Sequence, residues 1–185
     1  MTSSLVGSEM CIRDRNITDE AGNTLFPWKL HTMKNGLRVG IVGIVTDYVN
    51  IWEKEENLKG IHITDPFEAA KNALAQMKEQ TDLTICIYHG GFECDLESGE
   101  TLSQTTENVG YRICKELDFD ILLTGHQHMS VPGRDISGTY TVQPCDNAKE
   151  YQYLEVTMTD HEKSIRSELR QSDAAKGTVL ADKYR

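Results

Sequence analysis

The feature that most constrains this chain is a short apolar segment that runs into two histidines, residues 120–128 with the sequence DILLTGHQH. Residues 121–123 form a compact aliphatic run of the length expected for a buried strand. We expect Gly125 to allow a sharp exit from this strand, which a residue with a β-carbon would resist. Ligands of open α/β sheets bind beyond the carboxyl ends of strands, so the pattern predicts His126 and His128 at a functional edge.

A second apolar segment, residues 83–88 (LTICIY), also ends in a histidine, His89, which two glycines follow. Two buried strands that each present an imidazole at the carboxyl end predict one shared metal site. Side chains two positions apart share a side of extended backbone, so His126 and His128 could ligate one ion together. They could instead ligate one ion each of a pair held about 3.5–4 Å apart. In the alternative, one of them caps a turn and the other is merely solvated.

The apolar patterns elsewhere predict an α/β domain. Residues 37–46 (LRVGIVGIVT) are dense in Val and Ile and predict a central strand. Its two glycines lie inside the strand, which argues against a dinucleotide-binding fingerprint and favours close packing under a helix. A helix is predicted from Thr64 or Asp65 to about Gln80, because a capping side chain precedes a proline in the first turn. The stripe predicted to be buried consists of Phe67, Ala70, Leu74 and Met77.

Weaker patterns fill the remaining connections. Residues 48–60 predict an irregular or briefly helical surface piece, and residues 106–117 predict a capped helix. Residues 129–135 (MSVPGRD) predict a proline and glycine turn. Residues 140–143 and 153–159 alternate in polarity like antiparallel strands.

Composition limits the classes of function. A chain of 185 residues with 38% hydrophobic and 26% charged residues is ordinary for one globular domain. The formal net charge of −10 argues against a binder of nucleic acid polymers, which are held by clustered Lys and Arg. A small phosphate ester in a metal-lined pocket stays compatible, since metals supply positive charge. The acidic loop that holds Glu93, Asp95 and Glu97 could tune metal ions or bind water, or could simply be solvated.

Five cysteines are widely spaced and odd in number, and they include no CxxC pair, so they form a poor disulfide framework. Cys86 and Cys114 lie in apolar stretches and are predicted to be packed thiols. A zinc site that joins Cys94 to the histidines lacks the usual ligand spacing. Unpaired cysteines of this kind favour a reducing compartment.

The two ends of the chain differ from its middle. Residues 1–15 include LVGSEMCIRDR, which resembles a translated sequencing-adapter remnant and lacks the apolar stretch of a signal peptide. We treat this segment as extraneous to the fold. Residues 160–185 are charged and predict a helix or a linker. No apolar run approaches the ~18 residues that a membrane span needs.

The order of VGIVGI, DPFEAAK, ICIYHGG, ENVGYRIC and DILLTGHQH resembles the later half of a calcineurin-like metallophosphoesterase domain. Within that superfamily the chain is most similar to the 5'-nucleotidase and 2',3'-cyclic-nucleotide phosphodiesterase branch, over residues 16–159. The resemblance implies an α/β fold, an incomplete α/β/β/α sandwich with central mixed sheets. It also implies a partial domain over residues 16–160, and a linker or helix over residues 161–185 that leads toward an absent C-terminal domain.

The resemblance also implies a site and a chemistry. His89 and His126 would ligate one divalent ion and His128 a second, the ions being Zn, Mn or Fe. Glu107 and Asn108 fall on a recurring pair near the site in that family, and of the two Asn108 would contact substrate or support a ligand. In the family, two metals activate a hydroxide that attacks the phosphorus of a nucleotide or another phosphate ester. Proteins of this family are often exported to the cell envelope, in contrast to the reducing compartment that the cysteines favour.

The chain departs from the family pattern at its acidic ligands. It contains no Asp-x-His, no Gly-Asp and no Asn-His, and Gly22-Asn23 is followed by Thr24. The family's glycines near the site are replaced by residues 145–148 (CDNA). Without a bridging carboxylate, two cations near contact distance repel at a cost that neutral imidazoles do not offset.

Two hypotheses of different class follow. In the first, the chain is a fragment of a nucleotide phosphoester hydrolase, inactive alone, whose parent adds an N-terminal half-domain and a C-terminal substrate domain. In the second, it is a complete non-catalytic domain that binds a single zinc or no metal and acts as an interaction module. The truncated appearance of both ends favours the first, although fold resemblance alone does not establish activity.

Overall fold

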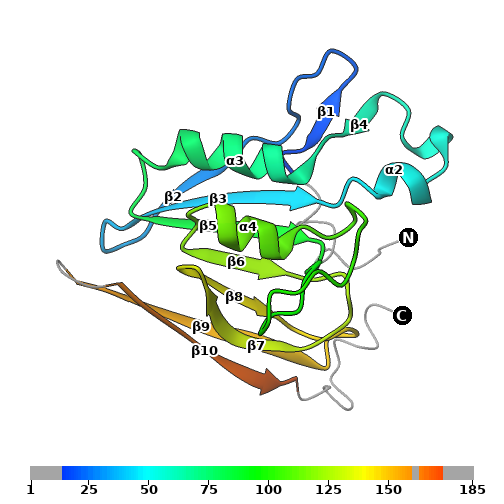
Figure 1. The fold of residues 1–185 in the computed structure, drawn as a ribbon. Coiled ribbons are helices and arrows are strands. Elements are labelled where there is room, and N and C mark those ends of the chain that lie inside the picture. The colour runs from blue at the N-terminus through cyan, green and yellow to red at the C-terminus, as the bar shows by residue number, and fades with distance from the viewer. Residues whose placement is uncertain (1–13, 160–162, 173–185) are drawn as a thin grey trace, which may run out of the picture.

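The fold is a six-stranded mixed sheet with helices on one face (Figure 1). The computed structural model describes residues 14–159 and 163–172. The strands in spatial order are β2 (Lys29–Thr32), β3 (Arg38–Val45), β5 (Leu83–His89), β6 (Ile121–Thr124), β8 (Thr139–Gln143) and β7 (Val131–Ile136). β3, β5, β6 and β8 are parallel, and the two edge strands are antiparallel to their neighbours. The predicted α/β class with a central mixed sheet is confirmed.

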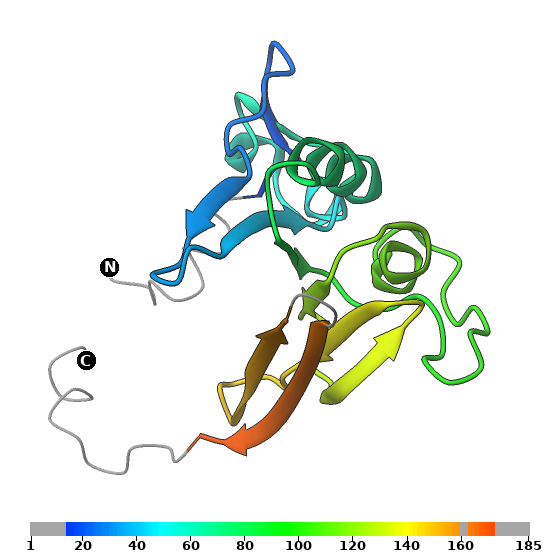
Figure 2. The ribbon, with the colours of Figure 1, turned by 90° about the vertical axis from the view of Figure 1, so that its left-hand side faces the viewer.

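The two faces of this sheet bury different sets of side chains. Helices α3 (Pro66–Met77) and α4 (Gly110–Glu116) cover one face, where Val42, Cys86 and Leu122 point into the larger core. The hairpin of β9 (Glu150–Met158) and β10 (Lys163–Gln171) packs on the other face, over Val39 and Ile121 (Figure 2). Alternate residues of each strand therefore enter opposite cores.

Smaller elements lie at the carboxyl edge of the sheet. β1 (Ile17–Asp19) pairs with β4 (Ile61–Ile63) in a separate two-stranded ribbon. Between β3 and β4, the chain forms the short helix α2 (Val49–Trp52) and the 3₁₀ turn η1 (Glu55–Asn57). This matches the briefly helical surface piece that the sequence predicts. Within the described residues, no helix has both the length and the apolar character that would let it cross a membrane.

Helix α3 forms where the sequence predicts it. Asp65 is its N-cap and accepts a hydrogen bond from the Glu68 backbone N–H at 2.9 Å, and Pro66 occupies the first turn. The helix ends at Met77, three residues before the predicted end. All four side chains of the predicted stripe are buried, at Phe67, Ala70, Leu74 and Met77. A β-carbon at Gly40 would lie 2.9 Å from the Met77 sulfur, which confirms close packing of that glycine under the helix.

Helix α4 is shorter than predicted, because it begins at Gly110 and not near residue 106. Its N-cap, Val109, offers no capping side chain. The Glu93 carboxylate caps the helix instead, accepting hydrogen bonds from the backbone N–H groups of Tyr111 at 3.0 Å and Arg112 at 2.7 Å. Glu93 is therefore a structural cap, and the acidic loop is not uniformly solvated.

Two further predictions are wrong for the residues that the structure describes. Residues 131–136 form the edge strand β7 and not a turn; Pro132 is tolerated because an edge strand need not donate to a ladder on both sides. Residues 140–143 and 153–158 do form strands with antiparallel partners, since β8 pairs with β7 and β9 pairs with β10. β8 also pairs in parallel with β6, which alternation in polarity does not reveal. Residues 163–171 form strand β10 and not a helix or linker. The rest of that predicted segment, 160–162 and 173–185, lies outside the described residues.

The described cysteines 86, 94, 114 and 145 are all free thiols. Cys86 and Cys114 are buried, as predicted, and burial raises the pKa of the Cys114 thiol to about 12. Cys94 is half-buried, with its Sγ 3.8 Å from the Thr101 hydroxyl.

Part of the segment treated as extraneous is packed into the fold. The Arg15 backbone N–H donates to the Gly43 carbonyl at 2.8 Å, and Asp14 is buried beside it. Asn16 follows and is fully buried. The side-chain NH₂ group of Asn16 donates to the backbone carbonyls of Val45 at 2.7 Å and Thr64 at 2.9 Å. The side-chain carbonyl of Asn16 accepts from the Val45 N–H at 3.0 Å. Asn16 thus joins the end of β3 to Thr64, between β4 and α3.

We predict that Asn16→Ala lowers the free energy of unfolding by about 2–4 kcal/mol, because it leaves buried backbone groups without partners. Urea denaturation followed by circular dichroism measures this change. The control is Asn57→Ala, which removes an exposed hydrogen bond to Glu53 and should change stability by less than about 0.5 kcal/mol. Equal effects of the two substitutions would contradict the role of Asn16.

Asp14 provides a prediction on pH. Burial raises the pKa of Asp14 from 3.8 to about 7, so between these values the folded chain keeps a proton that the unfolded chain has lost. The contribution of Asp14 to the free energy of unfolding therefore falls as pH rises from about 4 to 7, and it is constant above pH 7. Asp14→Asn should match the wild type near pH 4 and exceed it at pH 8, by on the order of 2–4 kcal/mol. Urea denaturation at both pH values measures the difference, and a difference that does not grow with pH would contradict the assignment.

Candidate functional site

The structure brings His89 and His126 side by side at the carboxyl edge of the sheet. β5 ends at His89, and His126 lies two residues beyond the end of its parallel neighbour β6. The centroids of the two imidazole rings are 5.5 Å apart, with the planes inclined by 59°. His89 is exposed to solvent, whereas the side chain of His126 is only 20% exposed. Both rings are thus close enough to act on one ligand.

His128 is near this pair, but no ring contact joins it to either histidine. The surrounding protein partly desolvates His89 and lowers its pKa, and the nearby charges of His126 and then His128 lower the pKa further. His128 is itself exposed. The rings of His89 and His126 are therefore in contact. His128 is linked to them only by its electrostatic effect on the pKa of His89.

The turn after β6 depends on the histidines and not on the glycine. His126 has φ 72° and His128 has φ 54°, both in the left-handed region that costs a non-glycine residue free energy. Gly125 does not have a positive φ, and a β-carbon there would meet nothing within 4 Å. The expectation that Gly125 enables the exit is wrong. The backbone is also not extended here, so the relative placement of the histidines does not follow from a two-residue alternation.

Gln127 lies between the histidines and ties their loop to the loop after β5. Its side-chain carbonyl accepts from the Phe92 N–H at 2.8 Å, and its amide donates to the Phe92 carbonyl at 2.9 Å. A β-carbon at Gly91 would overlap the Gln127 side chain, which explains why a glycine is required at that position after His89. The two histidine-bearing loops are therefore packed as one unit.

Asn108 supports the same unit from the α4 side. It is buried, and its side-chain carbonyl accepts a hydrogen bond of 2.6 Å from the Gly91 backbone N–H. The structure thus places Asn108 against the turn that follows His89.

Glu107 contacts the site directly, although of the pair Glu107 and Asn108 only Asn108 was predicted to have a role there. One carboxylate oxygen lies 2.9 Å from Nε2 of His126. The backbone carbonyl of Glu107 accepts hydrogen bonds from the Thr46 hydroxyl at 2.7 Å and from the Tyr88 hydroxyl at 3.1 Å. The ends of β3 and β5 thus hold Glu107 in place beside the end of β6. Its position next to Asn108 was the signal that could have identified it.

Trp52 and Asp47 are two further residues near this edge that the sequence reasoning missed. The indole of Trp52 stacks on the ring of His126, with centroids 5.1 Å apart and planes inclined by 27°. Trp52 is 50% exposed and lies on α2, beside Tyr48. Asp47 follows β3 and has one buried carboxylate oxygen without a described partner; burial and then the nearby Asp65 raise its pKa. No local sequence pattern indicates that Trp52 or Asp47 lies at this edge of the sheet.

The two imidazoles fit a shared ion as nitrogen ligands, because each comes from a strand end and imidazole is a common ligand for transition metals. The site is not complete. In the described part of the chain, no group of three or more His, Cys, Asp or Glu side chains is arranged to hold a metal ion.

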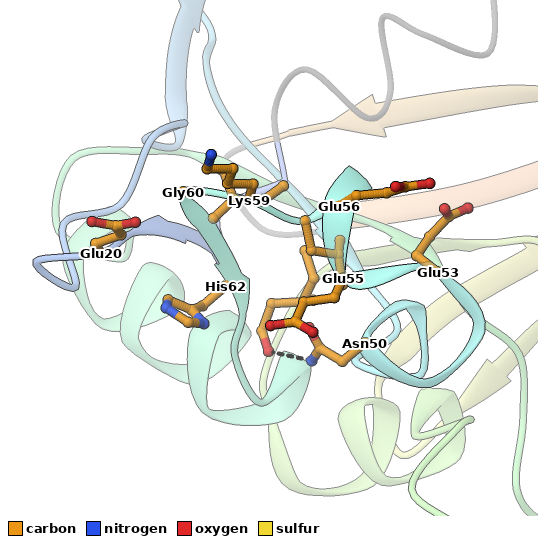
Figure 3. Close-up of a pocket in the computed structure, with 11 residues that line it drawn as sticks. Glu20, Asn50, Glu53, Glu55, Glu56, Lys59, Gly60 and His62 are labelled. Carbon is orange, nitrogen blue, oxygen red and sulfur yellow. Dashed lines mark hydrogen bonds between the residues drawn. The ribbon is translucent and has the colours of Figure 1, made fainter.

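A separate pocket of about 880 Å³ lies between β4, α2 and η1 (Figure 3). Four glutamates line it, against one lysine and His62, and none of the three site histidines takes part. The Asn50 amide in its wall donates to the Ile63 carbonyl at 2.8 Å. The excess of carboxylates would repel a phosphate group, so this pocket does not compete with the histidine edge as a phosphoester site.

Comparisons with known proteins point to one group. No family model matches the chain. It is 27% identical over 128 residues to a 2',3'-cyclic-nucleotide 2'-phosphodiesterase/3'-nucleotidase of Salmonella typhimurium, a match that covers 68% of this chain and 17% of that protein. It is 31% identical over 120 residues to a 5'-nucleotidase of Vibrio cholerae, with 63% and 21% covered. The chain thus spans less than a quarter of the length of these relatives.

Solved structures agree. A Staphylococcus aureus protein described as a 5'-nucleotidase superposes with a TM-score of 0.82 at 29% identity, over 92% of this chain and 34% of that one. The calcineurin-like phosphoesterase YfkN of Bacillus subtilis shares the fold, with a TM-score of 0.70 at 20% identity, over 90% and 57% of the two chains. These similarities confirm the resemblance: the chain is homologous to one part of longer proteins that include a 2',3'-cyclic-nucleotide phosphodiesterase/3'-nucleotidase and a 5'-nucleotidase, and it shares the fold of a calcineurin-like phosphoesterase.

Proposed function

We propose that the chain supplies part of the catalytic domain of a dinuclear-metal hydrolase that cleaves nucleotide phosphoesters. In this proposal His89 and His126 ligate one divalent ion and His128 the second, and Asn108 supports the site. The observation that carries the proposal is the meeting of the His89 and His126 rings, 5.5 Å apart, at the ends of adjacent parallel strands. The names of the relatives, a cyclic-nucleotide phosphodiesterase and a 5'-nucleotidase, support a nucleotide as the substrate.

Bound divalent ions would polarise the phosphoryl oxygens and make a water molecule a stronger nucleophile at neutral pH. The residues of this chain would position that chemistry. Gln127 and Asn108 hold the two histidine-bearing loops together through their hydrogen bonds to Phe92 and Gly91. Trp52 shields one face of the His126 ring from water. The site is thus organised by hydrogen bonds and by packing.

The acidic ligands that a metal pair needs are absent from this sequence, which has no Asp-x-His and no Gly-Asp. Neutral imidazoles alone do not offset the repulsion between two close cations. We therefore propose that residues 16–160 act together with a further part of the parent protein. The hairpin β9–β10 leaves Ile41, Ile85 and Leu123 partly exposed on the sheet face that it covers, which suits an additional packing layer.

A non-catalytic domain that binds a single zinc or no metal is the second candidate. The incomplete ligand set in the described residues favours it. The two candidates differ in what further parts of a protein would add to this chain. The hydrolase would acquire its second ion and its activity from them, whereas the interaction module would acquire neither.

We predict that cobalt(II) binds the chain and quenches the emission of Trp52, because Trp52 stacks on His126. His126→Ala should weaken cobalt binding by at least about tenfold, as expected for the loss of a ligand. Fluorescence titration measures the affinity, with Trp28→Phe used to remove the other tryptophan. The control is His31→Ala, which changes an exposed histidine on β2. Identical cobalt affinities for His126→Ala and the wild type would contradict the metal site.

We further predict that this chain alone hydrolyses 5'-AMP and bis(p-nitrophenyl) phosphate negligibly with added manganese or zinc. The physical reason is the missing carboxylate charge. A colorimetric assay of released nitrophenol or phosphate measures the turnover. Robust hydrolysis that disappears in His126→Ala would show that the chain holds a complete site.

A further inference from the structure

The geometry points to Glu107 as the positioning residue that fixes the tautomer of His126: it keeps the proton on Nε2 and leaves Nδ1 as the atom that binds the metal. This inference rests on the proposed function, because it names the ligand atom of that site. Its basis is the contact of 2.9 Å between the Glu107 carboxylate and Nε2 of His126.

An ionised carboxylate can only accept hydrogen bonds, so the nitrogen that faces it must carry the proton. In a neutral imidazole the other nitrogen then has a free lone pair. Histidines that bind metals commonly donate their second ring N–H to a carboxylate, which orients the ring and raises its basicity as a ligand. Glu107 and His126 have the arrangement of such a pair.

The ring of His126 is also held by its face and by its backbone. Trp52 stacks on the ring at 5.1 Å, and the left-handed φ of 72° restricts the backbone that carries it. Rotation of the ring that would exchange Nε2 and Nδ1 must break the Glu107 contact and slide the imidazole against the indole. The stacking of Trp52 on the ring face and the contact of Glu107 with Nε2 therefore define one orientation of the His126 ring.

The position of the Glu107 backbone does not depend on the Glu107 carboxylate. Its backbone carbonyl is clamped by the hydroxyls of Thr46 and Tyr88, both fully buried, and the adjacent Asn108 is held by Gly91. Substitution of the carboxylate should consequently leave the loop in place. An ion pair at a partly exposed position is worth only about 0–1 kcal/mol in stability, so folding should also be preserved.

The test measures the tautomer by long-range ¹H–¹⁵N NMR of the imidazole nitrogens in the full chain without metal. The wild type should show His126 protonated at Nε2. Glu107→Gln should keep that tautomer, because its amide carbonyl still accepts the N–H. Glu107→Ala should give a mixture of both tautomers. Wild-type protonation at Nδ1, or an unchanged tautomer in Glu107→Ala, would overturn the inference.

Zinc affinity by isothermal titration calorimetry gives the second measurement. Glu107→Ala should bind zinc about 10–100-fold more weakly than the wild type, with a smaller loss for Glu107→Gln. The matched control is Glu116→Ala, which removes an exposed pair with Arg112 and should leave both the tautomer and the affinity unchanged. Equal zinc affinity of Glu107→Ala and the wild type would overturn the positioning role. Absence of zinc binding by the wild type would instead defeat the metal site of the proposed function, and with it the assignment of Nδ1, while the tautomer still tests Glu107 separately.

Discussion

The parallel register between β5 and β6 is the constraint on which the rest of the site depends. Tyr88 pairs with Thr124, so both strands end at the same level and His89 faces the start of the loop that contains His126. Parallel strands deliver their carboxyl ends to one edge, whereas an antiparallel pair would send the two histidines to opposite edges. β3 joins the same edge through its pairing of Val45 with His89. The described groups that contact the His126 ring are His89, at the end of β5, Glu107, in the loop after β5, and Trp52, on the segment that follows β3.

The segment between β5 and α4 converts that alignment into a fixed site. Glu107 binds the ends of β3 and β5 with its backbone and reaches His126, near the end of β6, with its side chain. Glu93 in the same segment caps α4, and this cap lets the helix begin only after the residues that serve the site. The late start of α4 is thus the structural counterpart of the role of residues 107 and 108. Local helix signals were overridden by contacts with distant strands.

The sequence was a good guide where the signal is local. The apolar runs of β3, β5 and β6 and the stripe of α3 follow from periodicity and a capping motif, and the two histidine-bearing strand ends follow from them. Strand direction at β8 and the edge strand β7 could not be obtained in this way, because alternation in polarity is the same for either direction and a Pro-Gly pair also occurs at edges. Residues 163–171 have a weak alternating pattern that becomes a strand only by pairing with β9. Trp52 approaches His126 through a tertiary contact that no local pattern could reveal, and the resemblance places Glu107 near the site without indicating its contact with His126.

At His126 and His128, the shape of the turn needs a left-handed backbone, whereas metal binding needs an imidazole side chain. These two requirements are separate. Asparagine, aspartate and glycine adopt this conformation readily, whereas β-branched residues do so at a considerable cost. The turn can therefore lose its imidazoles to any of those three residues and keep its shape. During divergence, a descendant of this scaffold could give up metal chemistry in one or two steps while its sheet edge stays intact. Such a descendant would be expected to carry small polar residues or glycine at these two positions, and valine or isoleucine only with a rebuilt loop.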